Sequence, residues 1–178
     1  MCTNVNDLDA AIRKIPDFPK PGVLFYDITS ILINTEAFHY CIHEMSALYK
    51  NKNIKGVAAV EARGFLFAAP FAEKHNLPIV LIRKKGKLPG KTLTKSYSLE
   101  YGSAEIELHV DDIKKGNNYL LVDDLIATGG TLKASTELIQ EAGGLVTDIF
   151  GVVGLPFLQY NEILSGFNVS TLINYDSE

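Results

Sequence analysis

The stretch that most constrains this chain covers residues 119–131 and reads Tyr-Leu-Leu-Val-Asp-Asp-Leu-Ile-Ala-Thr-Gly-Gly-Thr. Its opening run of apolar residues does not alternate with polar ones, which predicts a central strand of a parallel sheet, buried on both faces. Two acids stand at the carboxyl end of this strand, and a glycine-rich turn then leads into an amphipathic helix that ends at Gly143 and Gly144. A strand, a turn and a helix in this order predict one unit of an α/β fold.

The turn after this strand combines features that suit a sugar phosphate. Residues 127–131 contain two glycines and two threonines, so the main chain can approach a ligand closely and hydroxyls add donors to the unpaired N–H groups of the first helical turn. The carboxylates of Asp123 and Asp124 would repel a bare anion, but they can accept hydrogen bonds from ribose hydroxyls. The alternative is an ordinary strand–turn–helix with acids at the turn. A receiver-domain acidic pair is disfavoured, because that chemistry requires no Gly-Gly phosphate loop.

The composition is that of one globular domain. At 178 residues, with 47% hydrophobic and 21% charged residues, the chain is long enough for a substantial single core. A net charge of −4 disfavours a nucleic-acid binder driven by overall charge. Cys2 and Cys41 lack CxxC spacing, so they indicate neither a zinc site nor a disulfide framework. The chain start lacks a signal-peptide pattern and no apolar run reaches about 18 residues, so we expect a cytoplasmic protein without a membrane span.

Strand and helix patterns alternate along most of the chain, which predicts a mainly parallel central sheet covered by helices on both faces. In such a sheet, ligands bind at the carboxyl ends of the strands. Residues 15–22 hold three prolines and are expected to be irregular, residues 104–110 alternate as an antiparallel or edge strand does, and Asn34 is the expected N-cap of the second helix. Further strands are expected over residues 23–28, 54–60, 77–82, 145–155 and 169–174, and helices over residues 5–15, 34–50, 64–75 and 157–164.

A second strand–turn–helix pattern occurs at Val-Glu-Ala-Arg-Gly-Phe, residues 60–65. Arg63 follows the strand end, where its guanidinium can fork onto a phosphate or hydrogen-bond a base in the same crevice. The alternative is a surface arginine paired with Glu61.

A basic arm, residues 83–95, carries six Lys or Arg residues and no acid. Gly86, Pro89 and Gly90 lie within it, which favours a mobile loop, and a mobile basic loop beside a sugar-phosphate site can close over phosphates and exclude water. A solvated basic loop without such a role is the alternative. Its two glycines are four positions apart, not the five of a P-loop, and no helix pattern follows, so a nucleotide hydrolase is excluded.

Taken together, several motifs resemble the adenine phosphoribosyltransferases, of the type I phosphoribosyltransferase family. They are the phosphoribosyl pyrophosphate (PRPP) motif of residues 119–131, joined by Ile-Pro-Asp-Phe-Pro (15–19), Gly-Val-Leu-Phe (22–25), Glu-Ala-Arg-Gly-Phe (61–65), Arg-Lys-Lys-Gly-Lys-Leu-Pro-Gly (83–90) and Ser-Leu-Glu-Tyr-Gly (98–102). The resemblance implies a single type I domain over residues 1–178, with a small N-terminal hood at 1–33, a flexible catalytic loop at 84–102 and a homodimeric assembly.

The implied reaction joins adenine to PRPP, giving AMP and pyrophosphate in purine salvage. Mg²⁺ would be the cofactor, held mainly through PRPP and pyrophosphate and not by direct protein ligands. The resemblance assigns Glu100, Arg63 and Tyr101 to catalysis, and it assigns PRPP and AMP to Asp123, Asp124, Ala127, Thr128, Gly129, Gly130 and Thr131. It assigns pyrophosphate to Ala62, Arg63, Arg83, Lys84 and Lys87, and adenine to Leu24, Phe25, Tyr26, Arg63 and Leu125.

In the implied hood, Phe25 and Leu125 would stack on the two faces of the purine. Main-chain groups around Leu24 and Tyr26 would read its amino edge, which favours adenine over a 6-oxopurine. Many relatives have a basic residue where this chain has Tyr26, so only a main-chain role carries over there. In the family, strained peptides are common in the loop at Glu61, so we expect an unusual backbone conformation at residues 61–63.

Two alternatives to the adenine enzyme remain. One is a phosphoribosyltransferase for hypoxanthine or xanthine, although no lysine or arginine of the hood stands out as a reader of an oxo group. The other is a PRPP- or purine-sensing regulator with the same fold. The segment after Gly144 carries no motif and is expected to be structural only.

Overall fold

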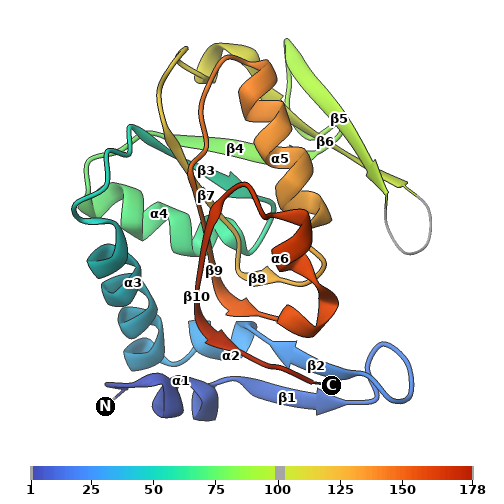
Figure 1. The fold of residues 1–178 in the computed structure, drawn as a ribbon. Helices are drawn as coiled ribbons and strands as arrows, with labels where there is room; N and C mark the ends of the chain where they lie inside the picture. The colour runs from blue at the N-terminus through green and yellow to red at the C-terminus, as the bar shows by residue number, and fades with distance from the viewer. Residues whose placement is uncertain (1, 99–102, 178) are drawn as a thin grey trace.

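The computed structural model describes residues 2–98 and 103–177 (Figure 1). A large sheet runs through the molecule in the order β10-β9-β7-β3-β4-β6-β5, with β8 paired to β9, and β1 and β2 form a separate two-stranded sheet. The strands are β1 Arg13–Pro16, β2 Leu24–Asp27, β3 Gly56–Val60, β4 Ile79–Lys84, β5 Thr92–Ser98, β6 Ser103–His109, β7 Tyr119–Val122, β8 Leu125–Ile126, β9 Asp148–Gly154 and β10 Asn168–Asn174. The helices are α1 Val5–Ala11, α2 Thr29–Leu32, α3 Thr35–Tyr49, α4 Gly64–Lys74, α5 Gly130–Glu141 and α6 Tyr160–Ile163, with 3-10 turns η1 Val110–Asp112 and η2 Pro156–Leu158.

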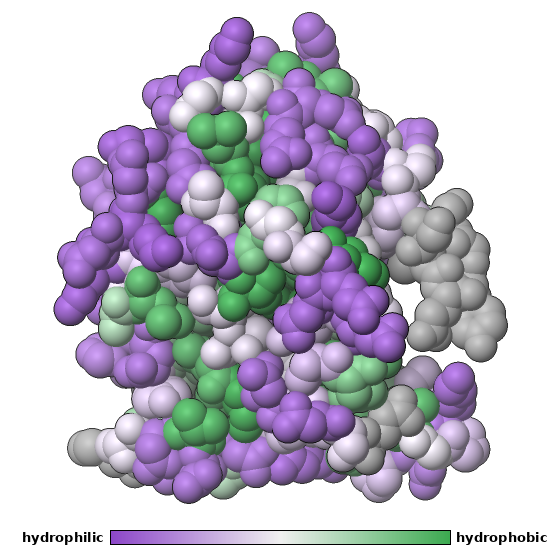
Figure 2. All heavy atoms as spheres, in the orientation of Figure 1, coloured by the Kyte–Doolittle hydropathy of each residue, from purple (hydrophilic) through white to green (hydrophobic). Residues whose placement is uncertain are grey.

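The central strands β10, β9, β7, β3 and β4 pair in parallel, and β6 and β5 add an antiparallel edge. Successive residues of β7 enter different cores: Leu120 packs in a cluster with α3 and α4, whereas Leu121 packs in a cluster with α5. Both faces of β7 are therefore covered, which explains why the strand is apolar at every position. The predicted mainly parallel sheet with helices on both faces is confirmed. Hydrophilic residues dominate the face shown in Figure 2, with small apolar patches between them.

Several predicted boundaries are also confirmed. Asn34 caps α3, because its side chain accepts a hydrogen bond from the Ala37 N–H at 3.1 Å. Cys41 is buried on the inner side of the same helix. After α5 the chain turns at Gly143, whose φ of 95° lies in the left-handed region that glycine adopts at helix ends. Across the described residues, no helix has the length and apolar character needed to cross a membrane.

The predicted first helix over residues 5–15 is wrong at its carboxyl end. Helix α1 stops at Ala11, and Ile12 is already extended, with φ of −84° and ψ of 119°. Strand β1 then pairs antiparallel with β2, so Ile15 and Pro16, which were expected to be irregular, belong to a hairpin. Pairing with the next strand in this hairpin overrides the local helical spacing. The predicted helix over 157–164 is likewise divided, at Gln159, where φ is 61°.

The predicted loop over residues 84–102 is wrong in part. Strand β4 extends to Lys84, and Thr92–Ser98 forms β5, which pairs along its whole length with β6. Leu93 and Tyr97 lie on one face of β5 and pack against the core beside α5. Two apolar residues four positions apart are a weak strand signal, so the pairing with β6 was not visible in the sequence. The basic arm is therefore a turn, residues 85–91, between two strands.

Candidate functional site

The predicted phosphate turn lies where β7 ends and α5 begins. A pocket of about 90 Å³ is lined there by Asp123 and by residues 125–132. Gly129 precedes the first helical turn with φ of 83°, and a Cβ there would lie 3.2 Å from side-chain atoms of both Tyr160 and Leu164. Glycine is thus required both for the turn and for the packing of α6 against it. The first N–H groups of α5 have no partner within the helix and face this turn, so they can bind an anion.

Two carboxylates and one guanidinium meet beside this turn. Asp124 is buried, with 4% of its surface exposed, and its Oδ2 lies 2.5 Å from Arg63 Nε. Burial, and next the charge of Asp124, raise the pKa of Asp123 well above its ordinary value. Asp123 Oδ1 accepts a hydrogen bond from the Asp124 N–H at 2.9 Å. The two carboxylates therefore lie side by side next to the turn, with one oxygen of each bound by a neighbouring N–H group.

The loop that carries Arg63 touches the end of β7. A Cβ on Gly64 would lie 2.9 Å from the Val122 carbonyl oxygen and 3.3 Å from Asp123 Oδ1. Only glycine allows α4 to begin this close to the acids. The Glu61–Ala62 peptide bond is cis, which confirms the unusual backbone expected in this loop.

Arg63 does not pair with Glu61, so the predicted alternative of a surface Arg63–Glu61 pair is wrong. Glu61 is instead bound by Arg83, with Nη2 to Oε1 at 3.1 Å, and by the Lys84 N–H at 3.0 Å. The hydrogen bond from Arg83 is the main cause that holds the pKa of Glu61 below its ordinary value. The side chains of Lys84 and Lys87 are exposed. The loop that carries Ala62 and Arg63 is thus joined, through Glu61, to Arg83 and to the main chain of Lys84.

The hood residues divide into two groups. Leu24, Phe25 and Leu125 are half-buried, and the ring of Phe25 meets that of Phe18 edge-on at 5.0 Å. Tyr26 is buried, and its ring stacks on Tyr175 at 3.8 Å. Because side chains alternate along a strand, Tyr26 points away from the side that Phe25 occupies. Of the predicted adenine residues, Tyr26 can therefore contribute only its main chain. Glu100 and Tyr101, the predicted catalytic pair, lie outside the described residues.

The structure identifies three supporting residues that the sequence did not reveal. They are Asp27, which binds Arg13 and Thr29, Glu107, which binds the turn of the basic arm, and Tyr175, which holds the hood. The basic arm contains no acid, so an acid in the strand pattern that follows it, such as Glu107, could have been identified as its partner. No local signal pointed to Tyr175.

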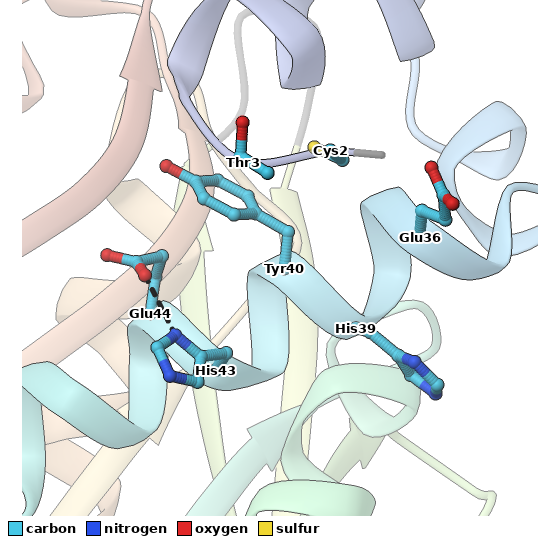
Figure 3. A pocket seen from close by; sticks show the side chains of 7 residues that line it. All are labelled: Cys2, Thr3, Glu36, His39, Tyr40, His43 and Glu44. Carbon is cyan, nitrogen blue, oxygen red and sulfur yellow. Dashed lines mark hydrogen bonds and ion pairs between the residues drawn. The ribbon is translucent and has the colours of Figure 1, made fainter.

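A larger hollow of about 470 Å³ lies between the N-terminal segment and α3 (Figure 3). Its lining contains none of the predicted site residues and consists of Cys2, Thr3, Glu36, His39, Tyr40, His43 and Glu44. In Figure 3, the Tyr40 ring lies beside Thr3, while His39 points away from them. This hollow is separate from the acidic and basic loops described above.

Comparison with known proteins identifies the family. A model described as phosphoribosyl transferase domain matches residues 26–152. Adenine phosphoribosyltransferase from Treponema denticola is 59% identical over 171 residues, which span 96% of this chain and 90% of that protein. The solved adenine phosphoribosyltransferase of Thermoanaerobacter pseudethanolicus superposes with a TM-score of 0.93 at 41% identity, over 97% of this chain and 100% of that chain.

A third relative was solved with ligands bound. The enzyme from Saccharomyces cerevisiae, complexed with an imino-altritol bisphosphate and adenine, has a TM-score of 0.88 at 33% identity, over 94% of this chain and 97% of that chain. Identity and coverage of this extent, on top of the family match, show that the chain belongs to the adenine phosphoribosyltransferases of the phosphoribosyltransferase family.

Proposed function

We propose that this chain transfers the phosphoribosyl group of PRPP to adenine, giving AMP and pyrophosphate in purine salvage. The observation that carries the proposal is the position of the Asp123–Asp124 pair, in which Asp124 binds Arg63 and Asp123 lines the pocket at the start of α5. Amides and hydroxyls of residues 127–131 would hold the 5′-phosphate, and the two acids would accept hydrogen bonds from the ribose hydroxyls. The relatives named above are adenine phosphoribosyltransferases, which supports the same base for this chain.

The cations around the cis loop would hold the leaving pyrophosphate. Arg63 already lies against Asp124, so its guanidinium is at the edge where ribose and pyrophosphate would meet. Arg83, Lys84 and Lys87 extend the positive charge along β4 and the following turn. In a displacement with little bond formation at the sugar carbon, positive charge develops on the ribose and negative charge on the departing pyrophosphate. Charged side chains held in fixed positions beside these groups therefore lower the barrier. We assign proton transfer at the base to Glu100 and keep Tyr101 as the second proposed catalytic residue of that segment.

The adenine would lie between Phe25 and Leu125, below the hood. Main-chain groups of Leu24 and Tyr26 would read its amino edge, and an oxo group at that position would leave a carbonyl acceptor unpaired. The half-buried state of Phe25 and Leu125 supports this assignment, because each side chain has a face left for a ligand.

Mg²⁺ is the proposed cofactor. Among the residues that the structure describes, no three His, Cys, Asp or Glu side chains form a group able to hold a metal. The ion would arrive with PRPP and take its ligands mainly from phosphate and water oxygens, with Asp123 and Asp124 nearby but not as direct ligands. When bound, Mg²⁺ would neutralise negative charge on the departing pyrophosphate.

We further propose a homodimer in the cytosol. Leu66 of α4 and Ile79 and Leu81 of β4 form an apolar strip, with 44%, 37% and 37% of their surfaces exposed. Leu81 lies beside Ala59 in register on the same face of the sheet, where Ala59 is buried in the core with α4 but Leu81 stays partly exposed. Arg83 is the next residue on that face, so a second copy seated on the strip would lie beside the pyrophosphate cations. Both cysteines are free, which suits a reducing compartment.

Supplying adenine, hypoxanthine, guanine and xanthine separately with PRPP and Mg²⁺ tests the proposed reaction. We expect adenine to be turned over much faster than the other three bases. Faster turnover of hypoxanthine than of adenine would overturn the assignment of adenine as the substrate. The double variant Asp123→Asn, Asp124→Asn should lose at least about 100-fold in turnover, the scale on which removal of transition-state electrostatics acts. Cys41→Ala, a change at a buried side chain of α3 outside the site, serves as the control. Equal losses in both variants would mean that the sugar site lies elsewhere.

A further inference from the structure

Glu107 of β6 is a buried acid whose carboxylate is bound by the basic turn. Only 4% of its surface is exposed. Its Oε1 accepts hydrogen bonds from the main-chain N–H groups of Lys87, at 2.9 Å, and Leu88, at 2.8 Å. Its Oε2 accepts one from Thr92 Oγ1 at 3.3 Å. One side chain therefore binds both the middle of the turn and the start of β5.

Two further side chains hold the same turn by its carbonyl groups. Arg83 Nη1 donates to the Lys87 carbonyl oxygen at 3.1 Å, and His109 Nε2 donates to the Pro89 carbonyl oxygen at 2.6 Å. Arg83 also binds Glu61, so the turn is connected through one guanidinium to the cis loop. The main chain on both sides of the Lys87 side chain is thus fixed, while its ammonium is free in solvent.

The charge of Glu107 is retained despite its burial. Burial alone raises the pKa of a carboxyl, but the N–H groups of Leu88 and Lys87 outweigh it and hold the pKa of Glu107 below its ordinary value. A buried carboxylate is a costly way to stabilise a sheet, since apolar residues of similar size often do so as well. What the carboxylate provides here is a fixed acceptor for two successive N–H groups of one turn.

We propose that Glu107 is a positioning residue for pyrophosphate binding, acting through Lys87. This proposal rests on the pyrophosphate role assigned to Lys87 above. An ammonium on a fixed main chain loses less freedom when it binds an anion than one on a mobile loop, so affinity rises without a new contact. Glu107 itself touches no substrate in this arrangement.

Glu107→Gln tests the proposal, with Glu105→Gln as the matched control. Glu105 precedes Glu107 by two residues on the same face of β6 and binds the exposed Lys85 at 2.9 Å, so both changes remove one negative charge near the turn. The loss of charge alone strengthens attraction of an anion in both variants. Glu107→Gln should instead raise the Kd of inorganic pyrophosphate, measured with Mg²⁺ by calorimetry, and the KM of PRPP by about tenfold, the usual scale for supporting residues. The Kd of AMP and the KM of adenine should stay within twofold of the wild type, and Glu105→Gln should not weaken pyrophosphate binding.

Lys87→Ala distinguishes the pyrophosphate-binding role of Lys87 from the positioning role of Glu107. If Lys87→Ala binds pyrophosphate like the wild type, the assigned role of Lys87 is wrong. If Lys87→Ala weakens binding but Glu107→Gln behaves like Glu105→Gln, the positioning role alone is overturned. In the Lys87→Ala background, Glu107→Gln should have little added effect, and an undiminished effect there would also overturn the proposal. Should Glu107→Gln fail to fold, as judged by AMP binding and thermal unfolding, Glu107→Asp keeps the charge but withdraws it from the N–H groups. It should show the same selective loss, and wild-type pyrophosphate affinity would refute the proposal.

Discussion

Gly64 is the residue at which the two ligand-facing loops touch. Its missing side chain lets the start of α4 lie against the end of β7, where the two acids begin. Close approach of this kind is decided by one hydrogen atom in place of a methyl group. It can therefore be tested by the smallest available substitution.

Gly64→Ala should lower kcat/KM by at least about tenfold and cost about 1 to 3 kcal/mol in the free energy of unfolding, because the added Cβ would overlap the Val122 carbonyl and press on Asp123. Gly166→Ala is the matched control, since a Cβ there would meet nothing within 4 Å. Denaturant unfolding and steady-state kinetics measure both effects. Wild-type behaviour of Gly64→Ala would show that the loops have room to separate.

Asp27 shows how a single carboxylate connects three elements within the hood, β1, β2 and α2, and makes stability depend on pH. It is 9% exposed, and it binds Thr29 Oγ1 at 2.6 Å, the Thr29 N–H at 3.0 Å and Arg13 Nη1 at 3.0 Å. The hydrogen bond from the Thr29 hydroxyl is the main cause that lowers the pKa of Asp27.

Asp27→Asn should lose about 1 to 3 kcal/mol of unfolding free energy at pH 7, the range for hydrogen bonds to a charged group. Because the folded pKa lies below the unfolded value of about 3.9, the contribution of the carboxylate is present above that value and is lost as the pH falls through the folded pKa. The difference between wild type and variant, measured by denaturant unfolding from pH 7 to pH 3, should therefore shrink at the acidic end. The exposed Asp111→Asn serves as control, and a difference for Asp27→Asn that stays constant with pH would contradict this account.

At the scale of elements, the end of β10 holds the hood in place. Figure 1 shows the chain leaving β10 toward the β1–β2 hairpin. Tyr175 stacks on Tyr26 of β2 with 14° between the ring planes, donates to Asp9 Oδ1 of α1 at 2.5 Å, and has Lys14 Nζ of β1 5.3 Å from its ring centre. The C-terminal segment, expected to be structural only, thus contacts three elements of the hood that would cover adenine.

Tyr175→Ala should raise the KM of adenine by about tenfold, because a loosened hood must be ordered again when the base binds, and leave the Kd of pyrophosphate unchanged. It should also cost about 1 to 3 kcal/mol in unfolding free energy through the lost ring packing. Tyr175→Phe keeps the stack and loses only the hydrogen bond to Asp9, so a smaller effect is expected. An unchanged adenine KM in Tyr175→Ala would show that the hood is held by its own hairpin.

At the scale of the whole molecule, the sheet has one parallel centre and one antiparallel edge, and the proposed ligand-binding residues are spread over both parts. The parallel centre brings the carboxyl ends of β3 and β7 together, which places Arg63 against Asp124. The turn of the basic arm connects β4 to β5, and its anchor Glu107 lies on β6. The apolar strip on β4 lies between these parts and is partly exposed.

Leu81→Glu should convert the proposed dimer into a monomer, because a charge at the centre of an apolar interface must be desolvated without a partner. Sedimentation equilibrium measures the change, and Leu48→Glu, at a side chain of α3 that is 45% exposed, is the control for added charge. If Leu81→Glu loses both the dimer and its activity, this would support a contribution from the second copy to the pyrophosphate site. A wild-type sedimentation profile for Leu81→Glu would place the interface elsewhere.

The sequence by itself determined the central strand, the phosphate turn, the covered parallel sheet and the presence of Arg63 in the site. These features depend on contiguous residues: an unbroken apolar run, a Gly-Gly helix start and a glycine beside the arginine. Each of them is a local consequence of main-chain geometry and burial. The family resemblance extended the assignment to the hood and the basic arm.

Only the tertiary structure decided which charges pair and what holds the loops. Arg63 binds Asp124 and not Glu61, Glu107 fixes a turn about twenty residues away in the chain, and Tyr175, near the carboxyl end of the chain, stacks on Tyr26. Such contacts join residues that no local pattern connects, whereas β1 and β5 pair with the next strand along the chain in hairpins whose strand pattern is weak. Periodicity records which side of an element is buried, but the partner it is buried against is set by the packing of the whole chain.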